Sequence, residues 1–152
     1  MVDRSSLISM AKIKPIKTAY RVEHIKDKYG KYFAGPYGDS GDALWADKFT
    51  NCHYCMKKYP NPFYDKLLKL TFPMITSNMR KHICGFKSMK QLEAWFSPTE
   101  IRKLLKNGFA IVSYEVKIVV DGHKSLMFIP RGERTIIKQA KKKSKSKILK
   151  AS

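Results

Sequence analysis

Two short clusters hold all the cysteines of the chain and two of its four histidines. The segment TNCHYCMKKY places Cys52 and Cys55 two residues apart, and KHICGF carries His82 and Cys84. A two-residue spacing lets both thiolates of a tight turn bind one metal ion. If KHICGF is a strand, His82 and Cys84 project from the same face, because side chains alternate along a strand. The four side chains would then complete a closed tetrahedral zinc site.

The same cysteines also fit a purely structural role. The order C-x2-C…H-x-C differs from the common zinc-finger patterns, and free cysteine is often buried as a small hydrophobe. The chain contains no G-x-S-x-G elbow, Walker loop or G-x-G-x-x-G loop. The sequence therefore leaves zinc binding and core packing open, and it favours no nucleophilic or nucleotide-loop chemistry.

Charge is the dominant property of the chain. Its 152 residues include 31 Lys and Arg against 12 Asp and Glu, a formal net charge of +19. Such an excess predicts a polyanionic partner, with nucleic acid first, an anionic membrane second and an acidic protein third. Three cysteines form no self-contained disulfide framework, and no apolar stretch is long enough to span a membrane. We therefore expect a protein of the reducing cytoplasm.

The positive charge is concentrated toward the C-terminus. Residues 131–152 hold nine bases and one acid, residues 1–18 a net +3, and residues 19–130 a net +8. We expect a basic arm over 1–18, one folded domain over 19–130, and a lysine-rich tail over 131–152 that is disordered when free. The residues predicted to contact phosphates are Lys57, Lys58, Arg80, Lys81, Lys141, Lys142, Lys143, Lys145 and Lys147.

Hydrophobic periodicity and turn chemistry predict an α+β fold with a largely antiparallel sheet. Strands are expected over 19–24, 32–34, 81–86 and 109–120, with a hairpin at Asp121–Gly122 returned by 125–129. Ser88 with Gln91, and Ser97 with Glu100, predict the starts of two helices, and Asn107–Gly108 predicts the end of the second. In the long strand, alternation predicts one buried face, formed by Val112, Tyr114, Val116, Ile118 and Val120.

Four motifs resemble a scattered family of small, uncharacterised tailed-bacteriophage proteins. They are YRVEH (20–24), GPY (35–37), HICGFKSMKQLEAWF (82–96) and GFAIVSYEV (108–116), and the resemblance extends over residues 19–128. It implies a phage protein and carries no settled function.

A more distant likeness is to the ADP-ribosyltransferase fold. That resemblance implies an enzyme using NAD, with Arg21 contacting NAD on the first strand, Ser88 opening a helix, and Glu115 as the nearest acid to the catalytic position. The final strand, however, is preceded by GHKSLMF, which offers no catalytic Glu or Gln. A simpler role for Arg21 and Glu115 is a cross-strand ion pair on an exposed sheet face.

Three functions follow from these patterns. The leading hypothesis is a small basic phage accessory protein that binds nucleic acid or a host nucleoprotein machine. The first alternative is the NAD-dependent transferase. The second is an inhibitor or structural protein that binds an acidic protein partner.

Overall fold

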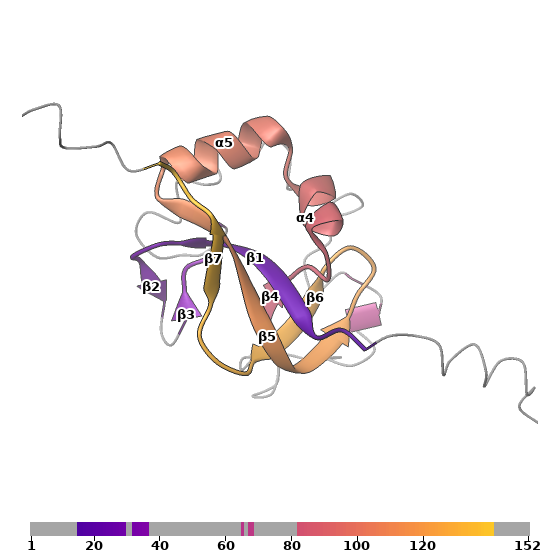
Figure 1. Cartoon of the computed structure of the whole chain (residues 1–152). Coiled ribbons are helices and arrows are strands. Elements are labelled where there is room, and N and C mark those ends of the chain that lie inside the picture. The colour runs from indigo at the N-terminus through magenta and orange to yellow at the C-terminus, as the bar shows by residue number, and fades with distance from the viewer. Residues whose placement is uncertain (1–14, 30–31, 37–64, 66, 69–81, 142–152) are drawn as a thin grey trace, which may run out of the picture.

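The computed structural model describes residues 15–29, 32–36, 65, 67–68 and 82–141. Figure 1 shows a strongly curved sheet with two short helices packed across one side. In chain order the elements are β1 (Thr18–His24), β2 (Lys28–Tyr29), β3 (Tyr32–Phe33), β4 (Ile83–Gly85), α4 (Met89–Trp95), α5 (Pro98–Lys106), β5 (Phe109–Asp121), β6 (Leu126–Pro130) and β7 (Thr135–Lys138).

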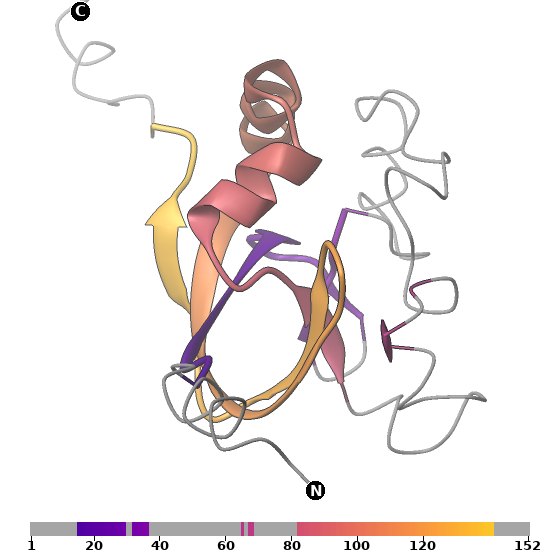
Figure 2. The same ribbon diagram turned by 90° about the vertical axis from the view of Figure 1, so that its right-hand side faces the viewer.

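The main sheet is antiparallel and is organised around the long strand β5. Its strand order is β1–β5–β6–β4, and β7 pairs with β5 as well. The first half of β5 pairs with β1, and its second half pairs with β6. The backbones of Tyr20 and Phe86 exchange two hydrogen bonds of 2.8 Å, which join β1 to the residue after β4. The sheet therefore curls round on itself, as Figure 2 shows from the side. The predicted α+β class is confirmed.

The two helices begin where their capping residues predict. The Ser88 hydroxyl accepts a hydrogen bond from the backbone N–H of Gln91 at 3.1 Å and opens α4. Ser97 and Glu100 form a reciprocal capping box at the start of α5, with Pro98 at the first helical position. After α5, Gly108 has a φ of +87°, the left-handed conformation that glycine adopts most easily.

Apolar side chains pack on both faces of the first half of β5. On one face, Phe109 and Ile111 pack under the helices, against a set that includes Leu92, Phe96 and Leu104. The opposite face lines the inside of the curled sheet. Its buried residues are Ala19, Ala110, Val112, Tyr114, Val116, Leu126 and Phe128. A one-residue slip between β1 and β5 would exchange the two faces and move Arg21 and Glu23 of β1 under the helices, which disfavours any other register.

The predicted face of β5 is correct up to Val116 and wrong beyond it. The register with β6 shifts between Val116 and Ile118, so the alternation of side chains changes phase there. Ile118 is consequently 48% exposed, and Val119 packs against the interior cluster in its place. A bulge depends on how the strand pairs with its partner β6, so the pattern of residues 109–120 alone does not predict it.

The sheet continues into the segment predicted to be a tail. After β6, the chain leaves the strand over residues 131–134 and returns to β5 as β7, which pairs Ile136 with Val112. The sheet thus extends beyond the boundary expected at residue 130. Across the part of the chain that the structure describes, no helix has the length and apolarity needed to cross a membrane.

Candidate nucleic-acid interface

Glu23 is the most deeply buried acidic side chain of the sheet. It lies on β1 with 0% exposure, on the same face as Val112 and Tyr114 of β5. Its carboxylate accepts hydrogen bonds from Arg21 Nε at 2.7 Å, Arg134 Nη1 at 3.0 Å and Tyr114 Oη at 2.8 Å. A buried carboxylate is stable only when it is paired and hydrogen-bonded in this way. One negative charge is therefore enclosed between two arginines.

The two arginines are also fully engaged with the backbone. Arg21 Nη1 donates to the carbonyl oxygen of Cys84 at 2.8 Å, which links β1 to β4. Arg134 donates to the carbonyl oxygens of His24 and Ile25, and its guanidinium lies 3.4 Å from the centre of the Phe33 ring. These contacts make the cluster a structural element inside the curled sheet rather than a ligand site.

Two further acids are buried. Asp65 accepts hydrogen bonds from the backbone N–H groups of Leu67, Leu68 and His123, so it fastens the β5–β6 turn. Glu100 is 8% exposed, and its side chain completes the capping box of α5. The fold therefore removes three carboxylates from the solvent-facing surface.

The basic residues have the opposite distribution. Among the described residues, the exposed acids are Glu93, Glu115, Asp121 and Glu133. The exposed bases are Lys17, Lys26, Lys28, Lys87, Lys90, Arg102, Lys103, Lys106, Lys117, Lys124, Arg131, Lys138 and Lys141. Thirteen exposed bases against four exposed acids give the described surface a positive potential.

Six of these bases gather where β5 begins, and we call this region the basic end. The antiparallel pairing brings the end of β1 beside Phe109 and the end of β7 beside Ile111, while α5 leads directly into β5. Figure 1 shows the ends of α5 and β7 close together on one side of the molecule. The exposed bases carried there are Lys26, Lys28, Lys103, Lys106, Lys138 and Lys141. The four exposed acids lie on other parts of the described surface.

Helix α5 adds an ordered basic stripe to this region. Its apolar side, Ile101 and Leu104, is buried against the sheet. The opposite side exposes Thr99, Arg102, Lys103 and Lys106, which follow the i, i+3, i+4, i+7 spacing of one helical face. Lys103 and Lys106 also lie in the last turn, where the helix dipole favours positive charge.

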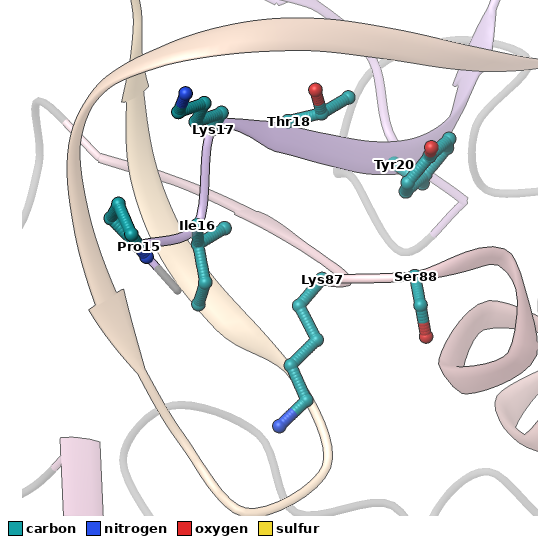
Figure 3. A pocket seen from close by; sticks show the side chains of 7 residues that line it. All are labelled: Pro15, Ile16, Lys17, Thr18, Tyr20, Lys87 and Ser88. Atoms are coloured by element: carbon teal, nitrogen blue, oxygen red, sulfur yellow. The ribbon is translucent and has the colours of Figure 1, made fainter. Parts of the chain in front are cut away.

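A surface groove of about 770 Å³ lies elsewhere, between the start of β1 and the link from β4 to α4. Figure 3 shows its lining: Pro15, Ile16, Lys17, Thr18, Tyr20, Lys87 and Ser88. Acids accompany its two lysines. Lys87 Nζ is 3.6 Å from Asp121 Oδ2, and Glu115 is opposite Thr18 in the β1–β5 register. The groove therefore lacks the unbalanced positive charge of the basic end.

The residues suggested by the transferase resemblance do not form one site. Arg21 pairs with Val112 and Glu115 pairs with Thr18, so the two side chains lie on opposite faces of the β1–β5 ribbon. The cross-strand ion pair expected between Arg21 and Glu115 is therefore wrong, and the partner of Arg21 is Glu23. Ser88 acts as the N-cap of α4.

The predicted zinc ligands are only partly described. Cys52 and Cys55 lie outside the described residues, and the described part of the chain contains no group of three or more potential ligands. Cys84 packs with Met127, with 3.1 Å between the two sulfur atoms. Burial raises the pKa of the Cys84 thiol, against a smaller opposing effect of Arg21, so the neutral form is favoured. That setting is typical of a core cysteine.

Of the predicted phosphate-binding residues, Lys141 is described and exposed. The others, Lys57, Lys58, Arg80, Lys81, Lys142, Lys143, Lys145 and Lys147, lie outside the described residues. The bases of α5 and those at the ends of β1 and β7 are not among the residues predicted from the sequence. For α5 the sequence does hold a pattern that could have found them: Arg102, Lys103 and Lys106 are interspersed with its apolar residues, as expected for the exposed face of an amphipathic helix.

Comparison with known proteins identifies the family. The model of a family described as bacteriophage T4 Y00F protein matches residues 12–141. The match covers most of the chain, so the chain belongs to this phage protein family. No curated protein and no solved structure matches. The predicted phage origin is confirmed, and the likeness to ADP-ribosyltransferases finds no support in these matches.

Proposed function

We propose that this phage protein is an accessory factor that binds nucleic acid, free or within a host nucleoprotein complex, through the phosphate backbone. The observation that carries the proposal is the segregation of charge: six exposed bases gather at the basic end, where the one acid among them, Asp27, is half-buried, and the four exposed acids lie elsewhere on the described surface. Lysines that neutralise phosphates release condensed counterions, which gives affinity without a need for sequence-specific contacts.

The lysine-rich segment that follows β7 in the sequence also supports the basic end as the nucleic-acid interface. Lys141, the last described residue, follows β7 at the basic end, and the lysines of residues 142–147 continue from it in the sequence. A folded basic surface and a lysine-rich segment that follows it would contact neighbouring stretches of one polyanion. Linking two weak contacts in this way raises the total affinity.

The test compares two triple variants with the same loss of charge. The first replaces Lys103, Lys106 and Lys138 with alanine at the basic end. The second replaces Lys117, Lys124 and Arg131, which are also exposed but lie on other parts of the surface. Affinity for a short labelled duplex DNA and for the matching RNA is measured by fluorescence anisotropy over a range of salt concentrations.

The slope of log K against log salt is negative, and each duplex phosphate contact contributes about 0.9 to its magnitude. We therefore expect the first variant to make the slope shallower by about 2 to 3. The second variant should change the slope by less than about 1. Equal effects of the two variants would reject the basic end as the interface, and absence of wild-type binding at low salt would reject the function.

A further inference from the structure

Strand β7 is an edge strand with exposed side chains. Within the described residues, β7 pairs only with β5, and Figure 2 shows it on the outer side of the sheet beside that strand. All four of its residues, Thr135–Lys138, are exposed. An edge of this kind presents a row of backbone N–H and C=O groups with no strand partner.

The strand is held in place by contacts that lie just before it. Arg131 donates its backbone N–H to the carbonyl oxygen of Glu115 at 2.9 Å. Arg134, whose side chain is 10% exposed, is fixed by Glu23, by two backbone carbonyls at the end of β1 and by the ring of Phe33. The largely buried side chain of Arg134 therefore holds the start of β7 in place, although the residues of β7 themselves are exposed.

The side chains of β7 do little to protect this edge. Ile136 is 40% exposed and Ile137 is 47% exposed. Ile136 pairs with Val112 and Lys138 pairs with Ile111, so Ile137 is an extra residue that makes a bulge in β7. The bulge and the four-residue length of β7 limit how far the edge can pair, so it suits a short segment only. The only charge within the strand is Lys138, at its end.

We propose that β7 is a docking strand for an extended, acidic segment of a protein partner, which adds to the sheet by β-augmentation. A peptide strand offers both donors and acceptors to an open edge, whereas a phosphate backbone offers acceptors only. The nearby exposed charges are Arg131, Lys138 and Lys141 against Glu133 alone. This excess favours an acidic strand and opposes a second copy of the chain, because two edges with the same positive charge repel each other.

The probe is an end-capped peptide of alternating valine and glutamate, added to the full-length protein. Two matched peptides serve as controls: one with lysine in place of glutamate, and one N-methylated at alternate residues along its pairing edge. Backbone amide exchange of residues 135–138 is followed by NMR.

We expect the acidic peptide to slow exchange of the outward-facing amides of β7 and to bind at least about tenfold more tightly than either control, because backbone hydrogen bonds and charge both contribute. The variant Ile136→Thr/Ile137→Thr should weaken peptide binding and leave nucleic-acid affinity unchanged. That second result separates this inference from the proposed function.

Three results would overturn the proposal. The first is unchanged exchange in β7 at high peptide concentration. The second is equal binding of the N-methylated peptide, which would indicate charge attraction without strand pairing. The third is protection of β7 that grows with protein concentration alone, which would identify a second copy as the occupant.

Discussion

Arg134 donates a hydrogen bond to Glu23 across a sequence separation of 111 residues, with 3.0 Å between Nη1 and Oε1. The contact joins the first strand of the sheet to the segment that introduces its last strand. It also encloses the Glu23 carboxylate, so this acid is removed from the exposed surface. The same pair therefore stabilises the fold and contributes to its positive surface.

Replacing Glu23 with glutamine should strongly destabilise the protein. The substitution keeps the shape of the side chain but leaves two largely buried guanidinium groups without their negative partner. Losing one member of a buried ion network costs about 3 to 5 kcal/mol. Urea unfolding measures the effect. Glu115→Gln, an exposed site with the same change in charge, should alter stability by less than about 0.5 kcal/mol. Similar losses in both variants would contradict the role of the cluster.

Tyr114 should make stability fall at alkaline pH. Burial raises the pKa of its phenol above the ordinary value, and the neighbouring Glu23 charge adds to the rise. The unfolded phenol loses its proton near pH 10, whereas the folded phenol keeps it. The stabilisation is therefore complete below about pH 10 and decreases as pH rises further. Denaturation at a series of pH values should show a steeper alkaline loss in wild type than in Tyr114→Phe; parallel curves would disprove this.

Gly108→Ala should destabilise the junction between α5 and β5. The φ of +87° disfavours any residue with a Cβ, and an added Cβ would lie 2.7 Å from His24 Nε2. The imidazole has little freedom to move, because its Nδ1 accepts the backbone N–H of Asp27 at 2.9 Å. We expect a loss of about 2 kcal/mol in thermal or urea unfolding. Gly132→Ala, with no atom within 4 Å of the added Cβ, is the control and should be nearly neutral.

The lysine-rich C-terminal segment should add affinity without sequence preference. Replacing Lys141, Lys142, Lys143, Lys145 and Lys147 with alanine removes five positive charges. If each of the five lysines contacts a duplex phosphate, the slope of log K against log salt should become shallower by about 4 to 5. The change should be similar on DNA of unrelated sequence. Anisotropy titrations on two unrelated duplexes check this. An unchanged slope would exclude the segment from the interface.

Local chemistry in the sequence predicted much of the second half of the fold. Ser88 and Ser97 cap their helices through residues three positions later, and Gly108 ends α5, because these interactions depend on neighbours in the sequence. The hairpin after Asp121 follows from the same kind of local signal, and the backbone N–H of Gly122 bonds to the carbonyl oxygen of Ser125.

Features that depend on distant partners were not predictable in the same way. Arg21 pairs with Glu23 on its own strand only because Arg134 and Tyr114 complete the buried cluster. Ile118 becomes exposed because of a register shift against β6. The basic end was not predictable for a related reason: strand pairing brings together lysines that are far apart in the chain.

Lysine footprinting of the wild-type protein tests the proposed interface most directly. The protein is acylated with and without duplex DNA or RNA, and the reactivity of each lysine is measured by mass spectrometry. We predict that Lys26, Lys103, Lys106 and Lys138 lose reactivity when nucleic acid is present, while Lys117 and Lys124 keep theirs. Uniform protection of all lysines, or protection confined to Lys117 and Lys124, would contradict binding at the basic end.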